Sequence, residues 1–383
     1  MNNLVARPHS SVDKIPQIVA VARKSASSRL MHPLEKRRQQ LMQAFKMVSE
    51  NEQLLSAAMS ADLKRNSAEN HFVELYPVQA NIVQALNNLD DWNHVEPVTP
   101  SIVFMMDKCE TRRVPLGCVL IIGTWNYALT LILDPLVAAL AGGNTAVVKL
   151  SEVSTNMTNV LAHLIEKYMD PKVVQIVTGA VPETTVLLNQ KFDLIFYTGS
   201  TTVGRIIMQQ AAKTLTPVLL ELGGKSPVIV DEDCDFEATA SRILWGKIVN
   251  CGQTCIAPDY VLVHKKAEKQ LLAAFKSQFT KIVDGDFDTS DQYGRIISQG
   301  HFDRLKGLLD SQLKVAGTKT LIGGKTDRSS LFFEPTVLTG VGLDAETNPV
   351  MAGELFGPIL PVIVVASIDE AIRYVNSRYA QFT

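Results

Sequence analysis

The sequence has little of what marks several classes of protein. It contains only five cysteines in 383 residues, and their spacing resembles no disulfide ladder. The formal net charge is −2 and the basic residues are scattered, so we expect no nucleic acid or anionic membrane as a partner. No apolar run is long enough to span a bilayer. The sequence shows no internal repeat and no low-complexity segment.

The composition that remains is that of an ordinary globular protein. Hydrophobic residues make up 46% and charged residues 20% of a chain long enough for two domains. Cysteines without a disulfide pattern suit a reducing compartment, which predicts a cytoplasmic protein. Cys251 and Cys255 lie four residues apart, but no Cys or His pair elsewhere completes a zinc set. We therefore expect no metal.

Apolar residues at three- and four-residue spacing predict helices in the first hundred residues, over Val19–Ser49, Asn51–Asn66 and Asn70–Leu89. The basic run Lys36–Arg38 lies in this region and is interpreted as a solvated helix face. The apolar run Ile102–Met106 then predicts an extended segment between two prolines. A hairpin is expected near 101–114.

Strands and helices alternate from Val114 to Leu222, which predicts a parallel sheet with helices on its faces. The expected strands are Cys118–Ile122, Thr145–Lys149, Val173–Val177, Leu194–Tyr197 and Val218–Leu222. The expected helices are Leu131–Ala141, Thr155–Tyr168, Glu183–Asn189 and Thr202–Lys213. Ligands of such sheets bind beyond the carboxyl ends of the strands, where polar and glycine-containing segments follow here.

A second alternating region begins at Ser226. The expected strands are Pro227–Val230, Tyr260–His264, Phe332–Leu338 and Leu360–Val365, and the expected helices are Glu237–Val249, Ala267–Val283, His301–Asp310 and Asp369–Arg378. The fold class is therefore α/β in two domains. Residues 1–220 would hold the N-terminal helices, the hairpin and a Rossmann-like nucleotide-binding domain, and residues 221–383 a catalytic domain.

Three side chains have the chemistry of a covalent catalyst. Cys255 follows Gly252, which permits a sharp turn and leaves the sulfur accessible to a substrate, although a lone cysteine after a helix is usually structural. Glu221 ends an apolar strand before two glycines. Burial there would raise its pKa and make it a general base, whereas an ion-paired or solvated strand end is the alternative. Asn126 follows another strand and could donate to an oxyanion or form an Asx turn.

Four motifs in order resemble the aldehyde dehydrogenase family, most closely its class 3 group with the fatty aldehyde dehydrogenases. They are Gly123–Tyr127 (GTWNY), Leu220–Lys225 (LELGGK), Gly252–Tyr260 (GQTCIAPDY) and Glu354–Pro358 (ELFGP). The resemblance covers nearly the whole chain. It implies NAD(P)-dependent oxidation of medium- or long-chain aliphatic or aromatic aldehydes to acids. A truncated nucleotide-binding protein with impaired catalysis and a thiol esterase are the alternatives.

The resemblance also assigns roles to residues. Cys255 would attack the aldehyde, Asn126 and the Cys255 amide would hold the oxyanion, and Glu221 would activate water to release the acid. The expected cofactor is NAD, with NADP possible, because a carboxylate such as Glu152 near a ribose disfavours a 2′-phosphate. The residues expected to bind the cofactor are Trp125, Lys149, Glu152, Gly199, Ser200, Val203, Gly204, Leu222, Glu354 and Phe356.

The sequence departs from the family in three places. Ala128 and Leu150 stand where the family usually has proline, which should loosen both loops. The family continues beyond Thr383 with a substrate-tunnel loop, a strand that pairs with the partner subunit and, in some members, a membrane anchor. The resemblance implies a homodimer, but a missing strand would leave a sheet edge unpaired.

Overall fold

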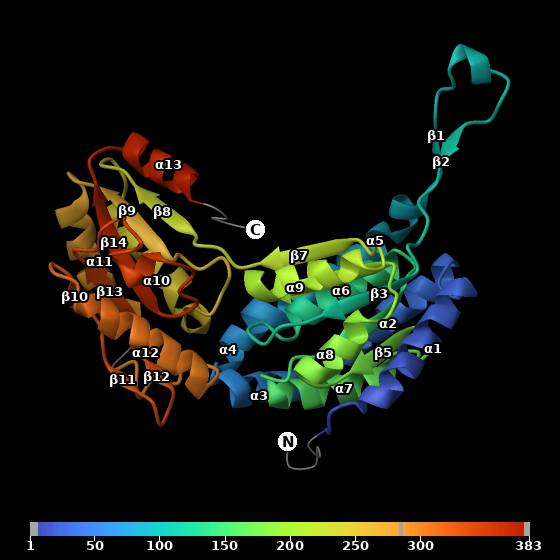
Figure 1. The fold of residues 1–383 in the computed structure, drawn as a ribbon, viewed down its shortest axis with the longest axis horizontal. Coiled ribbons are helices and arrows are strands. Elements are labelled where there is room, and N and C mark those ends of the chain that lie inside the picture. Colours follow the sequence, from blue (N-terminus) through green and yellow to red (C-terminus); the bar gives the residue numbers. More distant parts are fainter. Residues whose placement is uncertain (1–6, 283–285, 379–383) are drawn as a thin grey trace. The chain divides into compact units, whose positions relative to one another are not determined.

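The computed structural model describes residues 7–282 and 286–378, and its chain forms two compact units (Figure 1). Unit 1 comprises Met1–Ala58 and Asn70–Glu221, and unit 2 comprises Met59–Glu69 and Leu222–Thr383. The chain therefore changes unit between Glu221 and Leu222. The short segment Met59–Glu69, which the sequence does not single out, belongs with the C-terminal residues.

Helices form most of the first hundred residues, as predicted. They are α1 (Ile15–Ser27), α2 (Leu34–Ser49), α3 (Glu52–Leu63), α4 (Ser67–Asn70), the π-helical turn η2 (His71–Leu75) and α5 (Tyr76–Asn93). The predicted run Val19–Ser49 is interrupted, because Arg29 adopts a positive φ of 58° and Pro33 precedes α2. Buried apolar side chains recur along one side of α1 and α5, which accounts for the periodicity in the sequence.

The interpretation of Lys36–Arg38 as a solvated helix face is wrong for Arg37. Its side chain is buried, and its guanidinium donates to the carbonyl oxygens of Met31, His32 and Ala141. These bonds tie α2 to the preceding loop and to the end of α6 (Thr130–Ala141). Burial lowers the pKa of Arg37. A charge run in a sequence cannot reveal that its central member satisfies buried carbonyls.

Unit 1 is built around the predicted parallel sheet, whose strand order is β5-β4-β3-β6-β7. The strands are β3 (Cys118–Ile122), β4 (Thr145–Lys149), β5 (Val174–Val177), β6 (Leu194–Gly199) and β7 (Val218–Leu222). The helices between them are α6, α7 (Thr155–Tyr168), α8 (Val181–Leu188) and α9 (Thr201–Ala212). Every residue of β3 and β4 is buried, as expected for central strands covered on both faces.

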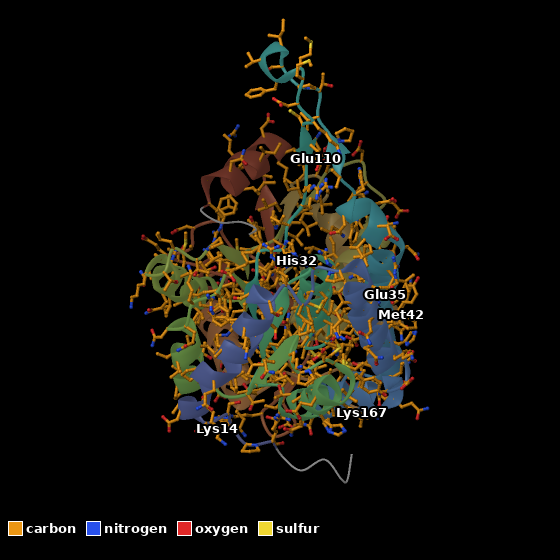
Figure 2. All side chains as sticks on the ribbon, turned by 90° about the vertical axis from the view of Figure 1, so that its right-hand side faces the viewer. Lys14, His32, Glu35, Met42, Glu110 and Lys167 are labelled. Carbon is orange, nitrogen blue, oxygen red and sulfur yellow. The ribbon has the colours of Figure 1, made fainter. Side chains whose placement is uncertain are left out.

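The hairpin expected near 101–114 is present, but its strands lie outside the apolar run. β1 (Glu96–Pro97) pairs with β2 (Glu110–Thr111), and η3 (Ile102–Phe104) forms a 3₁₀ turn between them. The extended conformation predicted for Ile102–Met106 is therefore wrong. Figure 1 shows the hairpin extending away from the helices of unit 1, and Figure 2 marks Glu110 on it. Met106 is 94% exposed, so burial does not hold this run extended.

Unit 2 contains a second five-stranded sheet, in the order β10-β13-β14-β9-β8. The strands are β8 (Pro227–Val230), β9 (Tyr260–His264), β10 (Lys319–Ile322), β13 (Thr336–Thr339) and β14 (Ile359–Val365). The helices are α10 (Phe236–Ile248), α11 (Glu268–Ile282), α12 (Gln299–Leu313) and α13 (Ile368–Ser377). β11 (Thr326–Asp327) and β12 (Phe332–Phe333) form a separate ladder, so the single strand predicted over Phe332–Leu338 is two. The predicted helix end at Val283 lies outside the described residues.

One apolar core joins the sheet and helices of unit 2. Tyr260, Phe275 and Leu305 are among its fully buried members. β14 pairs in parallel with both β9 and β13, whereas β10 runs antiparallel to β13 at the edge. Within the described ranges 7–282 and 286–378, no helix is both long enough and apolar enough to cross a membrane.

Candidate active site

The carboxyl ends of three strands of unit 1 meet at one edge of its sheet. The register aligns Ile122 at the end of β3 with Lys149 on β4 and with Tyr197 on β6. The segments that follow these strands contain the residues predicted to bind a nucleotide. The structure therefore brings Trp125, Lys149 and Gly199 to the same sheet edge, which the alternation of strands and helices predicted.

Lys149 and Glu152 form an ion pair at this edge. The Lys149 Nζ donates to Oε2 of Glu152 over 2.7 Å. The Lys149 side chain is only 5% exposed, whereas that of Glu152 is 40% exposed. A buried ammonium paired with a partly solvated carboxylate gives this edge both a donor and an acceptor for a ligand's hydroxyl groups.

A helix begins directly after β6. Ser200 is the N-cap of α9, and its Oγ accepts the Val203 backbone N–H over 3.4 Å. Gly204 is buried in the first turn. The N–H groups and the dipole of such a helix start favour an anion.

The loop after β3 holds Asn126, whose side chain is 3% exposed. The loop leads into α6, and its end is fixed by Glu74 of η2. Oε2 of Glu74 accepts the backbone N–H groups of Leu129 and Thr130 over 2.7 and 3.2 Å. Glu74 is fully buried and thereby positions the segment that contains Trp125 and Asn126. No local pattern in the sequence points to Glu74, because its partners lie 55 and 56 residues away.

Leu150, which stands where the family usually has proline, donates a backbone hydrogen bond that proline could not make. The Leu150 backbone N–H donates to the Val177 carbonyl over 3.1 Å and extends the ladder between β4 and β5. Leu150 is fully buried. This bond offsets the loosening expected there. Ala128 is also buried, at 5% exposure.

For Glu221 the sequence left two alternatives open, a buried general base and a solvated or ion-paired strand end. Glu221 is exposed on β7, where intermediate and exposed residues alternate. β7 is the edge strand of the sheet, so the side chains of Leu219 and Glu221 lie uncovered on one face. Of the two alternatives, the structure shows the solvated strand end, and Leu222 beside it is half-buried.

Cys255 in unit 2 follows a turn with an unusual backbone. Asn250, Cys251 and Gly252 have φ values of 51°, 53° and 67°, so three successive residues are left-handed. The first two are not glycine, and each costs roughly 1–2 kcal/mol in this conformation. A Cβ on Gly252 would lie 2.5 Å from the Gly357 carbonyl oxygen. The surroundings must therefore hold the turn.

The side chain of Gln253 makes several of the hydrogen bonds that stabilise this turn. It is buried, and its Nε2 donates to the carbonyls of Asn250 and Arg295 over 3.0 and 3.1 Å. Its Oε1 accepts the Ile297 N–H over 3.0 Å. The Asn250 Nδ2 returns a bond to the Gln253 carbonyl over 3.2 Å. The residue two positions before Cys255 is thus locked by buried hydrogen bonds.

The two cysteines of this segment differ in their surroundings. Cys251 is 1% exposed and belongs to the apolar core, and burial raises its thiol pKa. Cys251 is therefore a free thiol packed in the core. Cys255 is partly exposed. Of the two, only Cys255 has the access that a nucleophile needs.

The loop containing Glu354 packs against the glycine pair before β8. Gly223 leaves room for the Glu354 carboxylate, since a Cβ there would lie 2.0 Å from its Oε2, and the Gly224 N–H donates to the carboxylate. Burial and the nearby Asp259 raise the pKa of Glu354 to about 7. Phe356, two residues on, has a positive φ of 48° and is half-buried.

A buried cluster of Asp259, Lys225 and Lys247 binds the backbone of this loop. Both oxygens of Asp259 accept the Leu355 N–H, over 3.1 and 3.2 Å. Asp259 also binds the Nζ of Lys225 at 2.7 Å and of Lys247 at 3.5 Å. Burial lowers the pKa of Lys247 to about 8. Asp259 thus joins the LELGGK, GQTC and ELFGP segments, a role that the sequence analysis did not assign to it.

These observations divide the predicted residues between the units. Unit 1 brings Lys149, Glu152 and the start of α9 to one sheet edge, with Asn126 in the adjoining loop. In unit 2, Asp259 links the segment of Cys255 to Lys225 and to the loop of Glu354, and Gly252 packs against Gly357.

Comparison with known proteins agrees with this geometry. The model of the aldehyde dehydrogenase family matches residues 2–381, and the chain belongs to this family. It is 41% identical over 367 residues to the dimeric NADP-preferring aldehyde dehydrogenase of Canis lupus familiaris, covering 96% of this chain and 79% of the relative. It is 44% identical over 346 residues to aldehyde dehydrogenase family 3 member A2 of Macaca fascicularis, covering 90% and 70%. The resemblance to the class 3 group is thereby confirmed.

Solved structures show the same fold. The substrate-bound AldH of Staphylococcus aureus aligns with a TM-score of 0.91 at 34% identity, covering 95% of this chain and 78% of that one. The betaine aldehyde dehydrogenase of Staphylococcus aureus in complex with NAD⁺ aligns with a TM-score of 0.85 at 26% identity, covering 96% and 74%.

The contact at Gly252 gives a first prediction. Gly252→Ala places a methyl group against the Gly357 carbonyl and keeps a left-handed backbone that alanine disfavours. We expect kcat with an aldehyde to fall at least tenfold and the melting temperature to fall by several degrees. The matched control is Gly300→Ala, where a Cβ meets nothing within 4 Å. Equal activity in both variants, measured as NADH absorbance, would contradict the prediction.

Proposed function

We propose that this protein oxidises aldehydes to carboxylic acids, with NAD or NADP as hydride acceptor and Cys255 as nucleophile. Membership of the aldehyde dehydrogenase family over residues 2–381 supports the reaction class. The observation that carries the assignment of the nucleophile is the turn before Cys255, whose costly backbone is held by buried hydrogen bonds. A chain that only bound nucleotide would gain nothing from this turn, so the non-catalytic alternative is not favoured.

The chemistry proposed for the protein's own residues begins at Cys255. Its thiolate adds to the aldehyde carbon and gives a thiohemiacetal, whose oxyanion is stabilised by the Asn126 amide and the Cys255 N–H. Loss of hydride from that carbon leaves a thioester on Cys255. Glu221 then takes a proton from water, which attacks the thioester and releases the acid and the thiol. Glu221 is exposed on β7, so water has access to its carboxylate.

The residues present fit a nicotinamide dinucleotide, which accepts the hydride when bound. Among the described residues, Oε1 of Glu354 is a buried carboxylate oxygen without a hydrogen-bond partner, as expected of an acceptor for a ribose hydroxyl. Residues Gly199 to Gly204 would take the pyrophosphate at the start of α9. Lys149 and Glu152 would contact the adenosine ribose. Trp125, Leu222 and Phe356 would contact the remainder of the cofactor.

We propose that NAD is preferred and NADP accepted. Glu152 is paired with Lys149 over 2.7 Å, so this cation is already neutralised at the adenosine ribose. A 2′-phosphate there would face a carboxylate. The relative from Canis lupus familiaris is named NADP-preferring, which supports use of both cofactors.

The finer assignments rest on the family and the composition. We propose medium- or long-chain aliphatic or aromatic aldehydes as substrates, following the class 3 resemblance. We propose a homodimer, because the same relative is named dimeric. All five cysteines are free of disulfides, which supports a cytoplasmic location. The functions proposed for 1–220 and 221–383 are nucleotide binding and catalysis.

The role of Glu221 predicts a distinctive kinetic result. Glu221→Gln keeps the shape of the side chain but removes the base, so the thioester should form and then persist. We expect a burst of NADH of about one equivalent per chain with a fatty aldehyde, followed by turnover at least a hundredfold slower. Stopped-flow absorbance measures both phases.

The companion variant Cys255→Ser should show neither burst nor turnover. Turnover of Glu221→Gln at the wild-type rate would contradict the role of Glu221. Wild-type hydrolysis of nitrophenyl esters without any NADH formation would instead indicate a thiol esterase.

The raised pKa of Glu354 predicts a pH dependence of cofactor binding. With a pKa of about 7, Glu354 is mostly protonated at pH 6 and ionised at pH 8. The ionised carboxylate is the better acceptor for a ribose hydroxyl, so the KM for NAD should fall as pH rises through 7. Glu354→Gln should abolish this change, whereas the control Glu346→Gln on an exposed site should retain it. A KM for NAD that varies equally in all three proteins would refute the assignment.

A further inference from the structure

The segment Met59–Glu69 is the part of the first 221 residues that belongs to unit 2. It spans the end of α3, a loop in which Lys64 has a positive φ of 58°, and most of α4. The loop is closed on itself, because the Ser60 hydroxyl donates to the Arg65 carbonyl over 2.6 Å. Leu63 and Arg65 are fully buried. None of the four family motifs of this chain falls within the segment.

This segment contacts the first residue of the left-handed turn. The Asn250 backbone N–H donates to Oε1 of Glu69 over 2.8 Å, across 181 residues of sequence. α10 ends at Ile248, and Val249 is the last residue whose N–H bonds back into the helix, to the Trp245 carbonyl. The turn leaves the direction of the helix at Asn250. Glu69 therefore supplies the acceptor for the N–H group at which the backbone becomes left-handed.

The same segment also binds the loop residue Arg295, whose carbonyl accepts a hydrogen bond from Gln253. The Arg295 N–H donates to the Leu63 carbonyl over 2.8 Å. The Arg295 carbonyl and the Ile297 N–H in turn bind the Gln253 side chain. Gly294 is packed tightly between them, since a Cβ there would lie 3.0 Å from the Leu63 oxygen and 3.5 Å from the Cys251 sulfur.

These hydrogen bonds form a continuous chain that begins and ends on the segment Met59–Glu69. It runs from Glu69 to Asn250, through Gln253 to Arg295, and back to Leu63. Glu69 and Leu63 thus hold the turn from two sides of the same segment. Cys255 follows two residues after Gln253.

We propose that Glu69 is a positioning residue for Cys255, which acts by holding the Asn250 N–H and thereby the left-handed turn. The proposal rests on the role proposed above for Cys255. Glu69 touches neither substrate nor cofactor in this account. Without its carboxylate the turn relaxes towards right-handed backbone angles, and the Cys255 sulfur and amide lose their defined positions.

The test compares four variants of the full-length chain. Glu69→Ala removes the acceptor, Glu69→Asp withdraws it by one methylene, and Glu69→Gln retains an oxygen at the same reach. Glu346→Ala removes an exposed carboxylate of unit 2 as a matched control. The measurements are the rate of alkylation of Cys255 by iodoacetamide, read by peptide mass spectrometry, the hydrogen exchange of residues 249–256, and kcat and KM with aldehyde and NAD.

We expect the alkylation rate of Cys255 to change at least fivefold in Glu69→Ala and Glu69→Asp, with faster exchange over residues 249–256. In these variants kcat should fall at least tenfold, with the KM for NAD within twofold of wild type. Glu69→Gln should stay within threefold of wild type in every measurement, as should Glu346→Ala.

Two results would overturn the proposal. One is a folded Glu69→Asp with wild-type alkylation, exchange and kcat. The other is Glu69→Gln as impaired as Glu69→Ala, which would show that the charge acts in some other way than through the Asn250 bond. Failure of the proposed function is distinguishable, because it would appear as full dehydrogenase activity in Cys255→Ser whatever the outcome at Glu69.

Discussion

The left-handed turn at Asn250, Cys251 and Gly252 is the constraint on which the position of Cys255, the proposed nucleophile, depends. Two of its residues carry a Cβ in a conformation that disfavours one, and the third admits none. Buried bonds from Gln253 and the carboxylate of Glu69 hold this backbone. Strain of this kind persists only where the surroundings determine it fully, and it is common at sites of chemistry.

A buried carboxylate also holds the loop of Glu354 in unit 2. Asp259, four residues after Cys255, accepts the Leu355 N–H and binds Lys225 and Lys247. A single buried carboxylate therefore couples the nucleophile's segment to the loop of Glu354. Removal of Asp259 would leave the buried ammonium groups of Lys225 and Lys247 without the carboxylate that pairs with them, so this cluster is costly to alter. In unit 1 no such cluster is needed to bring the predicted residues together, because the parallel strands are in register and end at the same side of the sheet.

Much of the fold could be predicted because local patterns and tertiary structure agree. Thr145–Lys149 is a central strand of small and β-branched residues before its final lysine, and the structure matches the predicted bounds. Prediction failed where a distant partner decides. Arg37 is buried against the carbonyls of two segments, Met31–His32 and Ala141, and Glu69 meets Asn250 across 181 residues. The GQTCIAPDY motif indicated Cys255 as the nucleophile, but no neighbouring residue in the sequence indicated which side chains position it.

The most direct test of this account is to observe the covalent intermediate. The protein would be mixed with a fatty aldehyde and NAD, quenched in acid within the first turnover, digested and examined by mass spectrometry. The account predicts an acyl group on the peptide of Cys255, located on that sulfur and absent when NAD is omitted. An acyl group on Cys251, or acid formation without any acylated cysteine in the Glu221→Gln variant, would contradict it.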